Sequence, residues 1–168
     1  KVLSKFAKVN LCTASESNIV GGDTDNTAEH KFSGPHPAGL VGTHIHFVDP
    51  VGMKTFVWHT NYQEVIAIGK LFETGKLFTE RTISIAGPSA RNPRLVKTRV
   101  GACLCELTKE ESHETEEIRA ISGSVFGGRT SEDKFCYLGR FHHQVALLRE
   151  GTEREFMGWH SPGFDKFS

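Results

Sequence analysis

The first half of the chain mixes strand-like alternation with loop-like and helix-like segments. Residues 7–11 alternate between apolar and polar, which predicts a half-buried strand. Residues 13–29 are rich in Gly, Asp, Asn and Thr and predict a polar loop. Pro37 suits the first turn of a short helix running toward Phe47, because a missing N–H costs nothing there. Residues 55–59 predict another strand.

The clearest helix signal covers residues 62–74. Asn61 is a suitable N-cap, Glu64 stands at the capping-box position, and Gly75 suits the C-terminal end. Five residues with spacing i, i+3, i+4, i+7 and i+10 share one face: Tyr62, Val65, Ile66, Gly69 and Phe72. Strand, helix, strand and helix in this order favour an α/β layer arrangement for the first half.

The second half is richer in strand patterns. Strands are predicted for residues 81–86, 95–100, 120–125, 144–149 and 154–159, with a short amphipathic segment at 101–107. The segment 87–93 is a turn-rich connection, and Glu150-Gly151 turns between the last two strands. A hairpin, then a short helix, then further strands is the order of a β-grasp module.

The distribution of charged residues along the chain suggests a domain boundary. The 20 basic and 20 acidic side chains balance, which argues against nucleic-acid binding driven by a basic excess. All arginines lie at or after Arg81, and this shift suggests a boundary near residue 78. Six glutamates between Glu106 and Glu117 predict a solvated helix face or loop.

The longest uncharged run, residues 32–48, is shorter than the ~20 apolar residues of a membrane-spanning helix. The four cysteines are too sparse for a disulfide scaffold, so reduced thiols in a cytosolic protein are the expectation. The chain has no initiator Met or secretory leader and stops abruptly, which suggests a piece excised from a longer protein.

Candidate chemistry is sparse. His36, His44, His46 and His59, with Asp49, invite a metal hypothesis, but zinc sites need three or four convergent ligands, so packing and hydrogen bonding are preferred. Cys103-x-Cys105 has the wrong spacing for a redox dithiol, and Cys103 is expected to be a small core residue. Phosphate-binding glycine loops and a hydrolase nucleophile elbow are missing.

One basic cluster stands out in the second half. Its members are Arg91, Arg94, Lys97 and Arg99. The predicted strand distributes these side chains over two faces. A solvated edge or a partner surface is therefore favoured over an anion site.

Several segments, spread over nearly the whole chain, have characteristic sequences. They are GPHPAGLVGTHIHFVDPV at 34–51, NYQEVIAIG at 61–69, NPRLV at 92–96, ISGSV at 121–125, YLGR at 137–140, FMGW at 156–159 and DKFS at 165–168. Together they resemble the A subunit of the Na⁺-translocating NADH:quinone oxidoreductases. The family's subunit is longer at both ends, which agrees with an excised piece.

The resemblance implies a peripheral subunit on the cytoplasmic side of the bacterial inner membrane, without a transmembrane segment of its own. The complex passes electrons from NADH through flavins and iron centres to ubiquinone and exports Na⁺. Partners would be the other subunits and ubiquinone, with no nucleic acid.

The resemblance also implies a domain organisation. Residues 1–78 would be a Rossmann-like α/β part related to the flavin subunit of respiratory complex I. Residues 79–140 would be a β-grasp domain of the soluble-ligand-binding type, and residues 141–168 a β-hairpin and linker. The flavin loop and cluster cysteines of that relative are absent here, so this piece is expected to bind no cofactor, to carry no catalytic or metal-ligating residue and to be inactive alone.

The candidate ligand site is the segment 34–51. Gly39 and Gly42 leave room for a planar ligand, and His44 or His46 can donate a hydrogen bond to a quinone carbonyl. The alternative is that the glycines allow close packing and the histidines fill a crevice. These four residues form the quinone candidate set.

Two other functions remain open on the sequence alone. A fragment that itself binds flavin or nicotinamide would be yellow or fluorescent when purified. A stand-alone soluble-ligand module would have no flanking domains in its gene.

Overall fold

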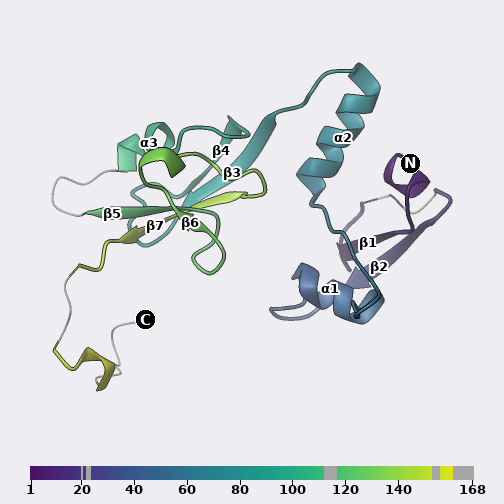
Figure 1. The fold of residues 1–168 in the computed structure, drawn as a ribbon, viewed down its shortest axis with the longest axis horizontal. Helices are drawn as coiled ribbons and strands as arrows, with labels where there is room; N and C mark the ends of the chain where they lie inside the picture. Colours follow the sequence, from purple (N-terminus) through teal and green to yellow (C-terminus); the bar gives the residue numbers. More distant parts are fainter. Residues whose placement is uncertain (20, 22–23, 112–116, 153–155, 161–168) are drawn as a thin grey trace. The chain divides into compact units, whose positions relative to one another are not determined.

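The computed structural model describes residues 1–168 except 20, 22–23, 112–116, 153–155 and 161–168. Contacts divide it into two compact units, Lys1–Phe78 (unit 1) and Thr79–Ser168 (unit 2). The division falls where the arginine distribution changes. Both units contain strands and helices (Figure 1), so the chain has the mixed α/β character that the pattern predicts.

Unit 1 contains a two-stranded parallel sheet. A short 3-10 turn, η1 (Leu3–Lys5), precedes β1 (Val9–Ala14), which pairs with β2 (Thr27–Phe32). The strand predicted at 7–11 is confirmed by β1, with a shift toward the C-terminus. The pattern misses the second strand, because its first residues lie in the predicted loop 13–29 and its burial alternates only weakly.

Two helices complete unit 1. Helix α1 (Val41–Val48) begins four residues later than the predicted start at Pro37, after two turns in which Ala38 N–H donates to the Pro35 carbonyl and Leu40 N–H donates to the Pro37 carbonyl. Helix α2 (Tyr62–Thr74) has the predicted bounds.

Both ends of α2 are capped as the sequence indicates. The side chain of Asn61 accepts a hydrogen bond from the backbone N–H of Glu64 at 3.0 Å. Gly75 adopts the left-handed conformation with φ 68°, which glycine enters without steric cost. Local sequence alone therefore accounts for this helix.

The predicted strand at 55–59 is wrong. These residues lie outside helices and strands, and the nearest pairing is an isolated bridge between Gly52 and Thr55. Phe56 and Trp58 are exposed. A strand needs a neighbour to satisfy its backbone groups, and none of the described residues pairs with this segment as a strand.

Unit 2 is built on a five-stranded sheet in the order β4-β3-β7-β5-β6 (Figure 1). Its strands are β3 (Glu80–Ala86), β4 (Arg94–Arg99), β5 (Ile118–Ser122), β6 (Arg129–Thr130) and β7 (Gln144–Arg149). Strands β3 and β4 form an antiparallel hairpin, while the last strand, β7, inserts parallel to β3 and antiparallel to β5. The sheet is therefore mixed.

Short helical turns lie between the strands of unit 2, and one follows the last strand. They are α3 (Leu104–Leu107), η2 (Lys109–Glu111), η3 (Asp133–Phe135) and η4 (Gly158–His160). The α3 helix lies within the predicted amphipathic segment 101–107.

The core of unit 2 lies on one face of this sheet. Its buried side chains are Ile83, Ile85, Leu104, Cys136, Leu138, Val145 and Leu147. The alternation of isoleucines in β3 indicates which residues of that strand face the core. Gly87 allows the hairpin loop to approach β7, since a Cβ there would collide with the backbone of Leu147.

The C-terminal segment differs from the predicted β-hairpin at 141–168. Strand β7 lies between β3 and β5 in the sheet and belongs to the core of unit 2. The strand predicted at 154–159 is not formed, because Gly158–His160 is a 3-10 turn; residues 153–155 lie outside the described part. Pairing with two distant strands replaces the local pairing that the turn Glu150-Gly151 suggests.

In the part of the chain that the structure describes, no helix has the length and apolar character needed to cross a membrane.

Candidate functional site

A hollow of about 340 Å³ lies beside α1. It is lined by Gly42, Ile45, His46, Pro50 and Val51. Two of the four quinone candidates, Gly42 and His46, therefore border one space. A Cβ at Gly42 would meet no heavy atom within 4 Å, so the glycine leaves open room at this surface.

The other two candidates are placed differently. His44 Nε2 lies 2.8 Å from the carbonyl oxygen of Ala38, and its ring lies 4.2 Å from that of Phe32. Its imidazole thus joins the turn before α1 to the end of β2. Gly39 lies in that turn and does not line the hollow. The helix turns His44 and His46 to different sides, as i and i+2 spacing requires.

Unit 1 also exposes many large hydrophobic side chains. The large hydrophobic side chains of residues 40–77 are exposed at Leu40, Val41, Phe47, Val51, Met53, Phe56, Trp58, Tyr62, Val65, Ile66, Phe72 and Leu77. We call these twelve side chains the apolar surface of unit 1. The predicted apolar face of α2 belongs to this surface.

In unit 2 Glu111 is a buried charged residue, of which 2% is exposed. Its carboxylate accepts hydrogen bonds from the backbone N–H of Arg91 at 2.7 Å and of Asn92 at 3.3 Å, and from the guanidinium of Arg94. Burial alone would raise the pKa of Glu111, but these donors outweigh it and hold the pKa below its ordinary value.

This network corrects one sequence-based interpretation and, at Arg94, part of a second. The acidic stretch is predicted to be solvated, yet Glu111 fastens the 87–93 loop to η2. The basic cluster is predicted to be a solvated edge or partner surface. Arg91, Lys97 and Arg99 are exposed and β4 is an edge strand, which agrees with a solvated edge, whereas Arg94 is paired internally with Glu111. No pattern in the sequence predicts an ion pair between residues seventeen positions apart.

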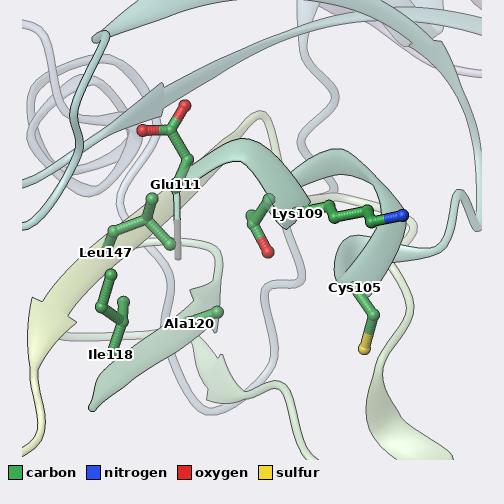
Figure 2. Close-up of a pocket in the computed structure, with 7 residues that line it drawn as sticks. Cys105, Lys109, Glu111, Ile118, Ala120 and Leu147 are labelled. Atoms are coloured by element: carbon green, nitrogen blue, oxygen red, sulfur yellow. The ribbon is translucent and has the colours of Figure 1, made fainter. Parts of the chain in front are cut away.

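A second hollow, of about 270 Å³, lies under η2 in unit 2. Its lining residues are Cys105, Thr108, Lys109, Glu111, Ile118, Ala120 and Leu147. Figure 2 shows Ile118, Ala120 and Leu147 on one side of the hollow, with Cys105 and Lys109 on the other. The Glu111 oxygens are engaged by the 87–93 loop and by Arg94, and the lining of the hollow combines polar and apolar side chains.

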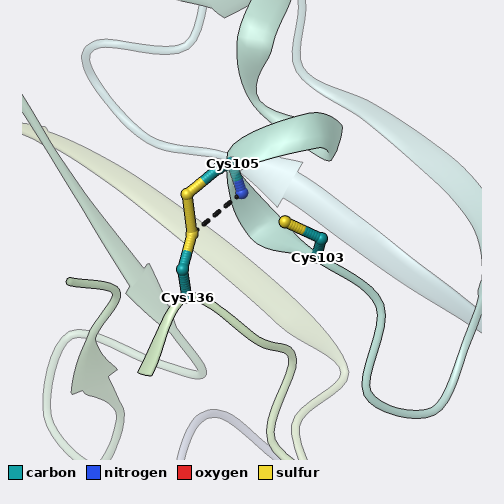
Figure 3. Close-up of side chains that lie close together, drawn as sticks. All are labelled: Cys103, Cys105 and Cys136. Carbon is teal, nitrogen blue, oxygen red and sulfur yellow. Dashed lines mark hydrogen bonds between the residues drawn. A yellow bond between two sulfur atoms is a disulfide. The ribbon is translucent and has the colours of Figure 1, made fainter. Parts of the chain in front are cut away.

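Three cysteine sulfurs meet beside this hollow (Figure 3). Cys105 and Cys136 are joined by a disulfide with a Cα–Cα distance of 6.2 Å, and the Sγ atoms of Cys103, Cys105 and Cys136 lie within 4.8 Å of one another. The expectation of reduced thiols is thus wrong for this pair. The two cysteines are 31 residues apart, and only the tertiary fold brings them together.

Within the described ranges, these cysteines are the only group of three side chains arranged to hold a metal ion. The disulfide already uses two of the three donor sulfurs, so the structure as it stands offers a metal one thiol. The histidines at 36, 44, 46 and 59 and Asp49 do not gather into such a group.

A serine and a histidine also pair in unit 2. Ser122 Oγ lies 2.8 Å from His142 Nδ1 and accepts a hydrogen bond from Gly139 N–H at 2.9 Å. Ser122 is fully buried, so no substrate reaches its hydroxyl, and the pair fastens the 139–142 turn to β5. Burial, with the charges of Arg129 and His143, lowers the pKa of His142.

Known proteins match the chain across both units. Family models match residues 1–77, described as the NqrA second alpha/beta domain, and residues 82–133, described as the NQRA C-terminal domain. The chain belongs to the NqrA family. Its relatives carry the name of the A subunit of Na(+)-translocating NADH-quinone reductase.

Three NqrA relatives illustrate the match. The protein of Histophilus somni (strain 129Pt) is 54% identical over 99% of this chain and 38% of its own length. That of Mannheimia succiniciproducens is 56% identical over 96% and 36%. That of Haemophilus influenzae (strain Rd) is 53% identical over 95% and 36%. The chain thus spans less than two fifths of the relatives it matches.

Proposed function

We propose that this chain is part of an NqrA subunit that contributes to assembly and quinone interaction in a Na⁺-pumping NADH:ubiquinone oxidoreductase. Electron transfer from NADH to ubiquinone would be coupled to Na⁺ export by the whole complex. The NqrA subunit would lie peripherally on the cytoplasmic side of the bacterial inner membrane. The family match over both units supports this proposal.

The fold supports the domain organisation that accompanies the proposal. In unit 1 a parallel strand pair with two helices is compatible with a Rossmann-like part. In unit 2 the hairpin, the short helix, and the parallel neighbours β3 and β7 are compatible with a β-grasp domain. Flavins, iron centres and NADH would be bound by other parts of the complex.

The assembly role rests on the apolar surface of unit 1. Exposed apolar area of this kind is typical of a surface that another chain segment covers. The relatives carry more than half of their length outside the matched region, so the remaining chain of the NqrA subunit is the occupant that we propose.

Assembly is tested in the intact complex with Trp58→Ser and Phe72→Ser, which remove exposed apolar area from unit 1. Leu95→Ser is the matched control, because Leu95 is 75% exposed on β4 of unit 2. We expect less NqrA to co-purify with its partner subunits in the first two variants only. Equal recovery of all three would contradict the proposed assembly surface.

The quinone role rests on the hollow beside α1, where Gly42 and His46 offer an open surface and a ring N–H. Gly42→Val places a side chain in the hollow, and its Cβ would meet no heavy atom within 4 Å. His46→Ala removes the donor. Each change is expected to raise the KM for ubiquinone while kcat is largely retained.

Two matched variants separate quinone binding from general damage. Gly69→Val introduces the same side chain in α2, also without a heavy atom within 4 Å, and His59→Ala removes another exposed imidazole. Both are expected to keep the wild-type KM. If Gly42→Val and His46→Ala also keep it in a correctly assembled complex, the hollow does not bind quinone.

A further inference from the structure

The three cysteines of unit 2 form an arrangement that the function proposed above does not use. Cys105 and Cys136 share a disulfide, and Figure 3 shows the Cys103 sulfur directed toward it. Cys103 is a free thiol, and its Sγ lies within 4.8 Å of both bonded sulfurs. The thiolate form of a cysteine at this distance is a nucleophile placed beside a disulfide.

The backbone keeps these sulfurs together without help from the S–S bond. Cys103 and Tyr137 form an antiparallel bridge. Leu104 N–H donates to the Cys136 carbonyl and Leu138 N–H donates to the Ala102 carbonyl, both at 2.9 Å. The segments 102–104 and 136–138 therefore stay side by side when the disulfide opens.

We propose that Cys103, Cys105 and Cys136 form a thiol–disulfide exchange site that presents a reactive thiol at Cys105. The Cys103 thiolate attacks Cys136 Sγ, a Cys103–Cys136 disulfide forms, and the Cys105–Cys136 bond breaks with Cys105 leaving as a thiolate. One thiolate and one disulfide stand on each side of this step, so it needs no outside oxidant or reductant.

The burial of the three residues sets the direction of this step. Cys136 is buried and remains bonded in both forms, while Cys105 is exposed and leaves into water, which stabilises its charge. The Cys105 N–H donates to Cys136 Sγ at 3.1 Å, and this hydrogen bond holds the attacked sulfur beside residue 105.

Exchange changes what the protein offers at its surface. Cys103 is half-buried, but Cys105 is exposed and borders the hollow of Figure 2. A Cys105 thiolate there attacks a small-molecule disulfide: a Cys105 mixed disulfide forms, and the second half of the molecule leaves as a thiolate. The ligand class of the site is therefore a small disulfide.

The position of the free thiol tests the exchange. The full-length NqrA subunit carrying this chain is kept without reductant, trapped with N-ethylmaleimide at successive times, then denatured and digested with trypsin. Cys103 and Cys105 share the peptide 100–109 and Cys136 lies in 135–140, so fragment masses within peptide 100–109 locate the label. We expect label on both Cys103 and Cys105, in a ratio that becomes constant.

Three variants decide the outcome. Cys103→Ser is expected to lose the Cys105 label completely, because the attacking thiol is gone. Cys105→Ser is expected to form a Cys103–Cys136 disulfide, while Cys12→Ser, which changes the free cysteine of unit 1, keeps the wild-type pattern. Label confined to Cys103 in the wild type, or free Cys103 and Cys136 in oxidised Cys105→Ser, would overturn the proposal.

The ligand class is tested with bis(2-hydroxyethyl) disulfide. Wild-type protein is expected to gain one hydroxyethylthio group on Cys105, and Cys103→Ser is expected to gain none there. An adduct on Cys103 alone, or an equal Cys105 adduct in both proteins, would show that exchange does not supply the reacting thiol. Circular dichroism of each variant verifies that the fold is retained.

Discussion

The two units of this chain bury apolar side chains very differently. Unit 2 closes a five-stranded sheet over seven clustered buried residues. In unit 1 the described residues include no buried hydrophobic side chain, and its buried residues in the described part are polar: Thr13, Gln63 and Glu64. Secondary structure forms in both. The difference teaches that correct local signals, such as the capped helix α2, do not by themselves produce a core.

The physical reason lies in topology. Unit 2 contains pairings between distant strands, including β3 with β7, so its apolar faces meet within the unit. Unit 1 contains one strand pair and helices whose apolar side chains are exposed or half-buried. Hydrophobic burial supplies most of the folding free energy, so unit 1 is expected to depend on contacts with the remaining chain of the NqrA subunit.

The largest expected effect comes from separating the units. Residues 79–168 expressed alone are expected to unfold cooperatively with heat, because their core lies within them. Residues 1–78 alone are expected to show no cooperative transition and to bind a hydrophobic dye. Circular dichroism melting and dye fluorescence provide the measurement, and a sharp transition in the 1–78 fragment would contradict the comparison.

The next effect compares single apolar side chains. Leu147→Ala removes a fully buried side chain and is expected to destabilise unit 2 by about 2–5 kcal/mol. Phe72→Ala, at a side chain 67% exposed, is expected to change the stability of the chain by less than about 0.5 kcal/mol. Hydrogen exchange of β7 and α2 amides at increasing urea concentrations measures the stability of each unit separately. Similar losses of stability in the two variants would contradict the difference between the units.

A smaller effect is expected at Glu111. Glu111→Gln removes the charge that binds Arg94 and the loop N–H groups, with an expected loss of about 2 kcal/mol in unit 2. Glu110→Gln, at the exposed neighbour, is the control with little change.

The pH dependence of this stability difference provides a second test of the Glu111 charge. Because the folded-state pKa lies below the ordinary value of about 4.3, the stabilisation is present above that pH and is lost as pH falls through the folded pKa. The two proteins are therefore expected to converge in acid. An unchanged difference there would show that the charge is not responsible.

The smallest effect is a pH dependence from His142, whose folded-state pKa is lowered. Its contribution is present above about pH 6.5, where both states are neutral, and is lost as pH falls because the unfolded chain binds the proton more readily. His142→Asn is expected to flatten the stability profile of unit 2 below that pH. Urea titrations of both proteins across this range measure the change, and parallel profiles would exclude His142 as the cause.

Local patterns in the sequence were enough for several features. Asn61 and Gly75 define both ends of α2 because caps act on neighbouring backbone groups. The isoleucines of β3 identify the core face, since side chains alternate along a strand. Characteristic sequence segments also indicated the family, because comparing consecutive residues requires no knowledge of contacts.

The candidate site was predictable only in part. The sequence drew attention to the segment 34–51, but only the helix geometry separates His46, beside the hollow, from His44, bonded to Ala38. The strand predicted at 55–59 failed because no described neighbour pairs with it as a strand. In unit 2, Glu111 with Arg94 and Cys105 with Cys136 came together through pairings across long stretches of chain. Such contacts depend on which strands become neighbours, and strand order is a property of the tertiary structure.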